Sequence, residues 1–162
     1  MNHQIFLLLG SNLGDRAANL ARARRHLQIA CGPILKASAI YTTAAWGVTD
    51  QPDFLNQALL IQSTLMPKAL LQTVLRIEQE IGRVRLQKWG ARTIDIDILF
   101  FGDIAVQTPD LVIPHPELQN RRFVLVPLSE IAGSFIHPLL DKSIAELLHS
   151  CTDTSAVEPY ML

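Results

Sequence analysis

The sequence predicts a single domain with an α+β fold, and three observations lead to this prediction. The chain has 162 residues, which is enough for one good hydrophobic core and too few for two ordinary domains. Apolar residues make up 49% of the chain and charged residues 18%, so burial can offset the conformational entropy lost on folding. Segments with strand character and segments with helical periodicity follow one another in the order β-α-β-β-α-β.

The first strand and the first helix are predicted near the amino terminus. Residues 4–12 (QIFLLLGSN) form an almost continuous apolar run that stops at a glycine, as is typical of a central strand covered on both faces. Apolar residues then repeat at helical spacing through residues 15–31. Asn12 or Asp15 suits the N-cap, and Gly32, followed by proline, suits the stop.

Residues 34–43 and 54–65 have extended character and predict a pair of strands. The segment between them, AAWGVTDQPD, is rich in turn-forming residues and longer than a hairpin needs. Pro67 then begins a second helix and Gly82 ends it, while an apolar stripe of four residues marks its buried side. The stretch TIDIDILFF (residues 93–101) predicts the next strand.

This order of elements is the split arrangement of a ferredoxin-like fold, a βαββαβ core whose sheet is covered by helices on one face. A short strand pair is expected in residues 103–115, a turn in residues 115–122 and a helical turn in residues 123–133. A last helix is expected at residues 142–149. The final dozen residues carry little pattern, so we expect them to fray.

Charge, cysteine content and hydropathy exclude several classes of protein. No apolar run approaches the roughly 20 residues that span a bilayer, and the start, MNHQIFLLLGSN, lacks the features of a secretory signal. Cys31 and Cys151 stand far apart, so neither a zinc site nor a disulfide framework is indicated. We expect a cytoplasmic monomer without a membrane partner. The net charge of -1 excludes little, because a local basic patch remains compatible with it.

Two carboxylates interrupt the apolar run of residues 93–101. Alternate side chains of a strand share a face, so Asp95 and Asp97 project together and the neighbouring isoleucines project to the other side. Their roots are roughly 6 to 7 Å apart, and a cation would relieve the repulsion between the two charges. Oxygen ligands without histidine or cysteine suit magnesium with substrate phosphates. On these residues alone, a solvent-exposed strand face is an equally good interpretation.

A basic, glycine-punctuated segment precedes the aspartates. It contains Arg83, Arg85, Lys88 and Arg92, and the planar fork of arginine matches phosphate oxygens. Such a loop beside magnesium suits a polyphosphate and its transfer. For any single arginine, a solvated loop that neutralises the aspartates is the better interpretation. Trp89 lies in the same charged loop, where packing alone hardly explains it, and it would serve as a plug or as a lid over a ring.

Two further groups of residues suit ligand binding. Phe54 and Asn56 share a strand face and offer an aromatic surface beside an amide, which suits a flat heterocycle. Core packing and a turn bond are the alternative. His115 lies between two prolines in a segment that also contains Arg121 and Phe123, and it could donate to phosphate; a surface histidine without a role is the alternative.

The segment GSNLGDR (residues 10–16) follows a strand and precedes a helix, as a phosphate-binding loop would. It lacks both the G-x-x-x-x-G-K-[ST] and the G-x-G-x-x-G patterns. We therefore assign it to structure, as a tight strand-to-helix turn.

Five blocks of the sequence, in this order, resemble one known family, the 6-hydroxymethyl-7,8-dihydropterin pyrophosphokinases of folate biosynthesis. The blocks are LLLGSNLGDR, DQPDFLNQAL, RIEQEIGRVR, WGARTIDIDILFFG and VIPHPELQNRRFVLVPL. The resemblance spans nearly the whole chain, and the Arg-Thr-x-Asp-x-Asp-x-Leu block is its most specific part. It implies a magnesium-dependent diphosphotransferase that moves pyrophosphate from ATP to the hydroxymethyl group of the pterin and releases AMP.

The resemblance also implies roles for individual residues. Asp95 and Asp97 would hold two magnesium ions bridging the phosphates of ATP, and with Arg83 and Arg92 they form the expected catalytic set. Phe54 and Phe123 would sandwich the pterin while Asn56 bonds its edge. The expected ATP-binding residues are Arg83, Arg85, Trp89, Arg92, Ile98, His115 and Arg121. The expected pterin-binding residues are Thr43, Ala44, Trp46, Phe54, Asn56 and Phe123.

A second hypothesis is a ferredoxin-like regulatory module that binds a nucleotide without catalysis, because fold does not fix function. Such a module needs neither two acidic metal ligands nor a loop of arginines, so these features disfavour it. RNA binding on this fold requires exposed aromatic residues on a basic sheet face. The apolar run IFLLLG and the acidic pair Asp95 and Asp97 provide neither exposed aromatic residues nor a basic face. We therefore expect no nucleic-acid partner.

Overall fold

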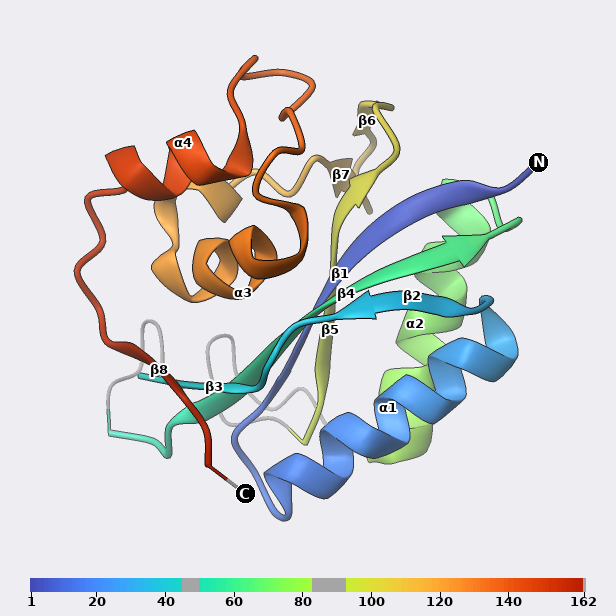
Figure 1. Ribbon diagram of the computed structural model, residues 1–162. Helices are drawn as coiled ribbons and strands as arrows, with labels where there is room; N and C mark the ends of the chain where they lie inside the picture. Colours follow the sequence, from blue (N-terminus) through green and yellow to red (C-terminus); the bar gives the residue numbers. More distant parts are fainter. Residues whose placement is uncertain (45–49, 83–92, 162) are drawn as a thin grey trace.

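The computed structural model describes residues 1–44, 50–82 and 93–161. Its main feature is an antiparallel sheet in the order β5-β1-β4-β3-β8, with β2 also paired to β4 (Figure 1). This is the order expected of the ferredoxin-like core, and the predicted fold class is confirmed. The strands are β1 (His3–Ser11), β2 (Ile34–Ala37), β3 (Tyr41–Thr43), β4 (Phe54–Ser63), β5 (Asp95–Phe101) and β8 (Val157–Pro159).

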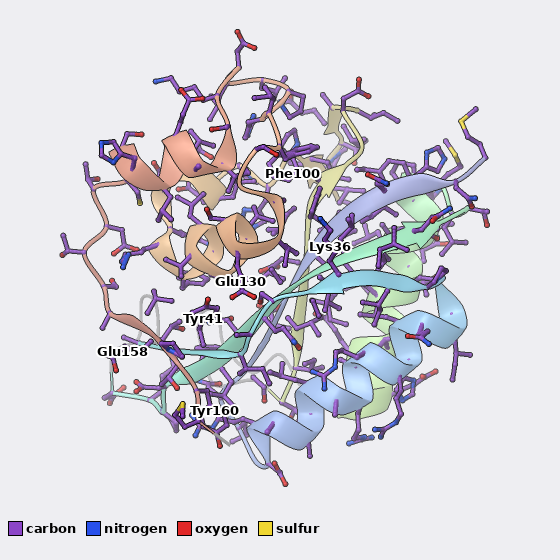
Figure 2. The ribbon with its side chains drawn as sticks, in the orientation of Figure 1. Lys36, Tyr41, Phe100, Glu130, Glu158 and Tyr160 are labelled. Carbon is purple, nitrogen blue, oxygen red and sulfur yellow. The ribbon has the colours of Figure 1, made fainter. Side chains whose placement is uncertain are left out.

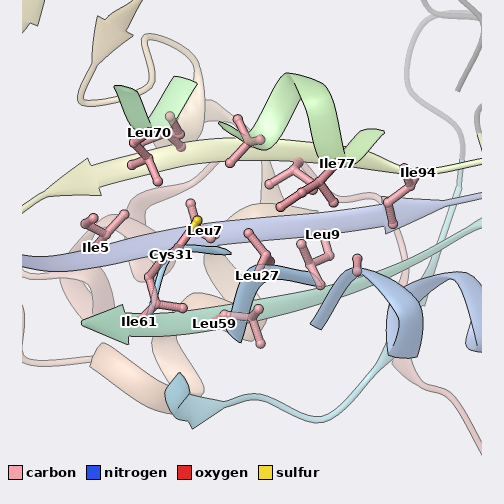
Figure 3. Close-up of a cluster of buried hydrophobic side chains, with 14 of the residues drawn as sticks. Ile5, Leu7, Leu9, Leu27, Cys31, Leu59, Ile61, Leu70, Ile77 and Ile94 are labelled. Atoms are coloured by element: carbon pink, nitrogen blue, oxygen red, sulfur yellow. The ribbon is translucent and has the colours of Figure 1, made fainter. Parts of the chain in front are cut away.

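The helices α1 (Arg16–Ala30) and α2 (Pro67–Ile81) cover one face of the sheet, as the sequence predicted (Figure 1). The Asp15 side chain caps α1 by accepting a hydrogen bond from the N–H of Ala18, and Gly82 ends α2 with a φ of 102°. Both helices pack on alternate residues of β1, namely Ile5, Leu7 and Leu9, each with 0% exposure (Figure 3).

Two further helices, α3 (Arg122–Ala132) and α4 (Ile144–Ser150), cover the opposite face. They form a second core with Phe6, Leu8 and Phe100. The expectation that helices cover only one face was therefore wrong. The physical reason is visible in β1, which is apolar at every position from Ile5 to Leu9 and must be covered on both sides.

The remaining elements lie between α2 and the chain end. Strands β6 (Val106–Gln107) and β7 (Val112–Ile113) form the predicted pair, and a 3₁₀ turn, η1 (Leu118–Asn120), follows. The helical turn expected in residues 123–133 is an eleven-residue helix, α3. The expectation of a frayed end was also wrong, because β8 pairs with β3. Within the described ranges, no helix is long and apolar enough to cross a membrane.

Strand β5 contains a bulge that separates its two halves. The register pairs Phe6 with Phe100 but Leu7 with Ile98, so Leu99 is an extra residue. Before the bulge, Ile96 and Ile98 join the core under α1 and α2. The alternating aspartates therefore share the other face, as the sequence predicted.

Candidate active site

Asp95 and Asp97 lie at the start of β5, which is the edge strand of the sheet. Both are partly exposed and border a cavity of about 310 Å³ that Glu78, His115 and Pro116 also line. Their cross-strand partners on β1 are Gly10 and Leu8. At this edge of the sheet the two carboxylates stay partly exposed while the neighbouring isoleucines of the strand are buried.

Glu78 of α2 holds the backbone between the two aspartates. Its side chain is 3% exposed, and Oε2 accepts a hydrogen bond of 2.7 Å from the N–H of Ile96. The contact fixes the edge of β5 where Asp95 and Asp97 project. The sequence analysis missed Glu78, although a charged residue four positions after Val74 in an apolar helical stripe was a usable signal.

His115 lies near both a carboxylate and a guanidinium. Burial, followed by the positive charge of Arg121, lowers the pKa of His115 below its ordinary value, against a smaller opposing effect of Asp95. Its Nδ1 accepts a hydrogen bond from the N–H of Glu117, at 3.3 Å. The neutral ring therefore carries its proton on Nε2, which is the atom able to donate to a phosphate oxygen.

A second part of the site lies across β1 from the aspartates. Gly10 pairs with Asp95 on one side and with Asn56 on the other, so these three residues form one row across the sheet. A Cβ at Gly10 would lie 2.8 Å from Asn56 Oδ1 and 3.4 Å from the Phe54 ring. Because Gly10 has no Cβ, the side chains of Phe54 and Asn56 can pack directly against its backbone.

Asn56 is held in place by a buried hydrogen bond. Its Nδ2 donates to Thr43 Oγ1 at 2.6 Å, and the two side chains are 3% and 2% exposed. Thr43 is also the cross-strand partner of Phe54. Strands β3 and β4 therefore bring together three residues expected to bind the pterin, and exposed Ala44 follows directly after β3.

The start of α3 supplies the remaining described residues of the site. Arg121 is the N-cap residue, and its guanidinium lies 5.9 Å from the centre of the Phe123 ring. Both side chains are partly buried, and Phe123 packs against the second core. Ile98 is 5% exposed in the first core and also borders the cavity of the aspartates.

Several expected site residues lie outside the described residues. In the basic segment these are Arg83, Arg85, Lys88, Trp89 and Arg92, and in the loop after β3 it is Trp46. Their roles therefore stay predictions.

The described acidic residues suit one kind of metal site. Across residues 1–44, 50–82 and 93–161, no group of three or more histidine, cysteine or acidic side chains could enclose a metal ion. The pair Asp95 and Asp97 is sufficient for Mg²⁺, because this ion takes one or two carboxylates and completes its octahedron with water and substrate phosphates. The donor set thus suits magnesium that is shared with a polyphosphate.

Comparisons with known proteins agree with this geometry. The fold is similar to solved chains of Plasmodium falciparum described as HPPK-DHPS, with a TM-score of 0.75 and 17% identity in the wild-type complex with pteroate. That match covers 92% of this chain and 42% of the solved chain, so this chain spans less than half of the length of that protein.

Curated relatives are much more similar in sequence. A 2-amino-4-hydroxy-6-hydroxymethyldihydropteridine pyrophosphokinase of Synechocystis is 42% identical over 158 residues, which cover 97% of this chain and 80% of the relative. The protein of the same name from Methylorubrum extorquens is 48% identical over 132 residues, with 81% and 84% covered. Residues 6–133 match the family described as 7,8-dihydro-6-hydroxymethylpterin-pyrophosphokinase. The chain belongs to this family of pyrophosphokinases.

Proposed function

We propose that the row Asp95, Gly10 and Asn56 is the centre of the site that carries the family's reaction. Pyrophosphate transfer from ATP to hydroxymethyldihydropterin, a step of folate synthesis, is the activity of this family. The single observation that supports the placement is the register, in which Gly10 pairs with the aspartate strand on one side and with the asparagine strand on the other. With strands about 4.8 Å apart, the backbones of Asp95 and Asn56 are about 10 Å apart.

The pterin is proposed to bind on the side of β4. Asn56 presents an amide that both donates and accepts hydrogen bonds, which complements the edge of a pterin ring. Its bond to Thr43 uses one N–H and fixes the amide plane. Phe54 and Phe123 supply aromatic faces for stacking, with Ala44 and Trp46 completing the pocket.

ATP is proposed to bind on the side of β5. Asp95 and Asp97 would hold magnesium, as two ions, and the metal would neutralise charge on the bridging phosphate oxygens when bound. His115 donates from Nε2 to a phosphate oxygen, and Arg121 adds positive charge beside it. Arg83 and Arg92 are proposed to contact the phosphates, with Arg85, Trp89 and Ile98 as further ATP-binding residues.

The reaction is an in-line displacement. The hydroxymethyl oxygen of the pterin attacks the β-phosphorus of ATP, a new O–P bond forms, and the bond from the β-phosphorus to the bridging oxygen of the α-phosphate breaks. AMP leaves with that oxygen, and the hydroxyl proton passes to solvent. The chain contributes positioning and charge stabilisation, since phosphoryl transfer requires little covalent chemistry from the protein.

The nucleotide product tests the proposal. Incubation of the protein with Mg²⁺, ATP and 6-hydroxymethyl-7,8-dihydropterin should release AMP and the pterin diphosphate, separated by ion-exchange chromatography. Release of ADP alone would refute pyrophosphate transfer. Binding of both ligands without any turnover would instead support a nucleotide-binding regulatory module.

A further inference from the structure

We propose that the C-terminal segment, residues 151–161, positions the pterin platform, and that Asp153 is the positioning residue by which it orients Phe123. The term pterin platform denotes Thr43, Phe54, Asn56 and Phe123. The inference rests on the proposed function, because it concerns the binding of the pterin. The residues that match the family end at 133, so the segment lies outside the matched part of the chain.

Asp153 binds the first turn of α3 from 31 positions further along the chain. Its Oδ2 accepts a hydrogen bond of 2.9 Å from the N–H of Arg122, the first residue of the helix. The first N–H groups of a helix have no acceptor within it, and a carboxylate there also interacts favourably with the helix dipole. Asp153 thus acts as a cap that the local sequence around α3 does not provide.

The Asp153 carboxylate is itself held in one orientation. Its Oδ1 accepts hydrogen bonds from the N–H of Ser155 at 2.9 Å and from the Ser155 hydroxyl at 2.6 Å. Partial burial alone would raise the pKa of Asp153, but the bonds from Ser155 and Arg122 outweigh it and lower the pKa below its ordinary value. The cap is therefore ionised and rigid near neutral pH.

The capped turn carries the aromatic side of the platform. Arg122 lies directly between Arg121 and Phe123, and the guanidinium of Arg121 packs 5.9 Å from the Phe123 ring centre. Fixing the N–H of Arg122 restricts the backbone dihedrals at the start of the helix. The direction of the Phe123 ring follows from those dihedrals, so a loose first turn would let the ring leave its stacking position.

The same segment also holds the opposite side of the platform (Figure 1). Strand β8 pairs Val157 with Thr43, and the N–H of Tyr160 donates to the Ile40 carbonyl at 2.8 Å. Strand β3 is only three residues long, so β8 supplies much of its support. The hydroxyl that orients Asn56 is thus anchored by the segment that caps α3.

A third contact reaches the start of β4. The guanidinium of Arg16 lies 5.9 Å from the centre of the Tyr160 ring, and its Nη1 donates to the carbonyl of Asp53 at 2.9 Å. Asp53 directly precedes Phe54. One continuous segment therefore supports all three places from which the platform is built.

The test compares Asp153→Ala with a matched loss of a helix cap elsewhere. Ser143 caps the neighbouring helix α4 through a capping box with Glu146, and it lies outside the site. Both Asp153→Ala and Ser143→Ala should lower the melting temperature by similar amounts. Only Asp153→Ala should raise the KM for the pterin, by about fivefold, which corresponds to the roughly 1 kcal/mol value of a cap. Its KM for ATP and its kcat should stay near wild type.

Two additional readouts separate positioning from general destabilisation. Calorimetric titration of the pterin in the presence of Mg²⁺ and α,β-methylene ATP, which cannot react, should show the same fivefold loss of affinity. Asp153→Asn retains a carbonyl oxygen that can accept from Arg122, so it should recover most of the affinity. If Asp153→Ala does not fold, Ser155→Ala serves as the test variant, because it removes the 2.6 Å hydrogen bond that orients the Asp153 carboxylate and should raise the KM for the pterin.

The possible failures are distinguishable. A wild-type protein that forms no AMP would refute the proposed function. A wild type that forms AMP, together with an Asp153→Ala variant whose pterin KM equals that of Ser143→Ala, would refute the positioning role alone. Equal losses of affinity for the pterin and for ATP would also overturn it, because they would indicate a general structural effect.

Discussion

The Asn56 side chain rests on Gly10, so close that a Cβ at Gly10 would lie 2.8 Å from Asn56 Oδ1. Replacing Gly10 by alanine should push the amide away and break its 2.6 Å bond to Thr43. We expect the KM for the pterin to rise about tenfold, the equivalent of one lost buried hydrogen bond, with little change in the KM for ATP. Steady-state kinetics with each substrate varied in turn measures both values.

Gly102→Ala is the control for that variant. Gly102 has a φ of 52° and open space around its Cβ position, so alanine there costs backbone strain without touching the pterin platform. An unchanged pterin KM in Gly10→Ala would contradict the role of the bare glycine.

The aspartate pair should be required for turnover. Asp95→Asn and Asp97→Asn remove the charge while retaining the shape, and each should lower magnesium-dependent kcat by about 100-fold or more, because metal clamps supply several kcal/mol of charge stabilisation. Circular dichroism should remain that of the wild type. Asp103→Asn, an exposed position just beyond β5, is the matched control. Near-normal activity in both site variants would refute the metal site.

The titration of His115 tests the electrostatics of the site. NMR titration should give a pKa below the ordinary value of about 6.5, since burial and then Arg121 disfavour the imidazolium. Arg121→Gln should raise this pKa, whereas Arg25→Gln on α1 should not change it. A pKa that Arg121→Gln leaves unaltered would contradict the assigned proximity.

The same shift has a consequence for stability. A histidine whose pKa is lowered in the folded protein makes its full contribution to the free energy of unfolding above about pH 6.5. That contribution is lost as the pH falls through the folded pKa. His115→Gln should therefore flatten the dependence of the unfolding free energy on pH in this acidic window, as measured by urea denaturation.

Tyr41 and Glu130 link β3 to α3, and Figure 2 shows their side chains pointing toward one another. The Tyr41 hydroxyl donates to Glu130 Oε1 at 2.5 Å, and Oε2 of the same carboxylate accepts from the N–H of Ala39. The hydrogen bond to Glu130, with burial and the charge of Glu130, raises the pKa of Tyr41 to about 12. Tyr41→Phe should lower the free energy of unfolding by about 1 kcal/mol at neutral pH.

The sign of this pH dependence is opposite to that of His115. A tyrosine with a raised pKa contributes stability below its ordinary pKa of about 10, and the contribution is lost as the pH rises toward 12. Tyrosinate absorbance of the wild type, compared with Tyr41→Phe, identifies the late titration. Glu130→Gln should return Tyr41 toward its ordinary pKa, and a wild type without a late-titrating tyrosine would contradict the contact.

The six predicted elements of the core were recognisable because each contains its own signals, but the single strand predicted at residues 34–43 was wrong, since it is two strands, β2 and β3, that each pair with β4. Helix α2 begins at Pro67 and ends before Gly82 as expected, and the unbroken apolar run of β1 indicated a central strand. The same run implied cover on both faces, but the prediction of a ferredoxin-like core with helices on one face did not use it. The length of helix α3 was underestimated because Pro127 interrupts its helical sequence pattern. Strand β8 was missed because three residues are too few to show the alternation of a strand.

The shared face of Asp95 and Asp97 was predictable because the two carboxylates repeat at strand spacing. Glu78 was missed because its role depends on the N–H of Ile96, a contact made only after α2 packs on β5. Asp153 was missed for a related reason, since its partner lies 31 residues away and no local motif connects the two. Such contacts depend on tertiary geometry, which periodicity and composition do not specify.

The extra residue at Leu99 sets a limit on how the length of β5 can vary. Before it, Asp95 and Asp97 lie on the face opposite the core under α1 and α2; after it, Phe100 and Phe101 face opposite cores in the reverse phase. Deleting Leu99 would join Ile98 directly to Phe100, so both halves of the strand would keep their partners on β1 and their faces, at the cost of the bulge and of one buried leucine. The phase of β5 is therefore compatible with loss of the residue at Leu99, whereas an insertion or deletion among residues 95–98 would turn side chains of the strand to the other face of the sheet.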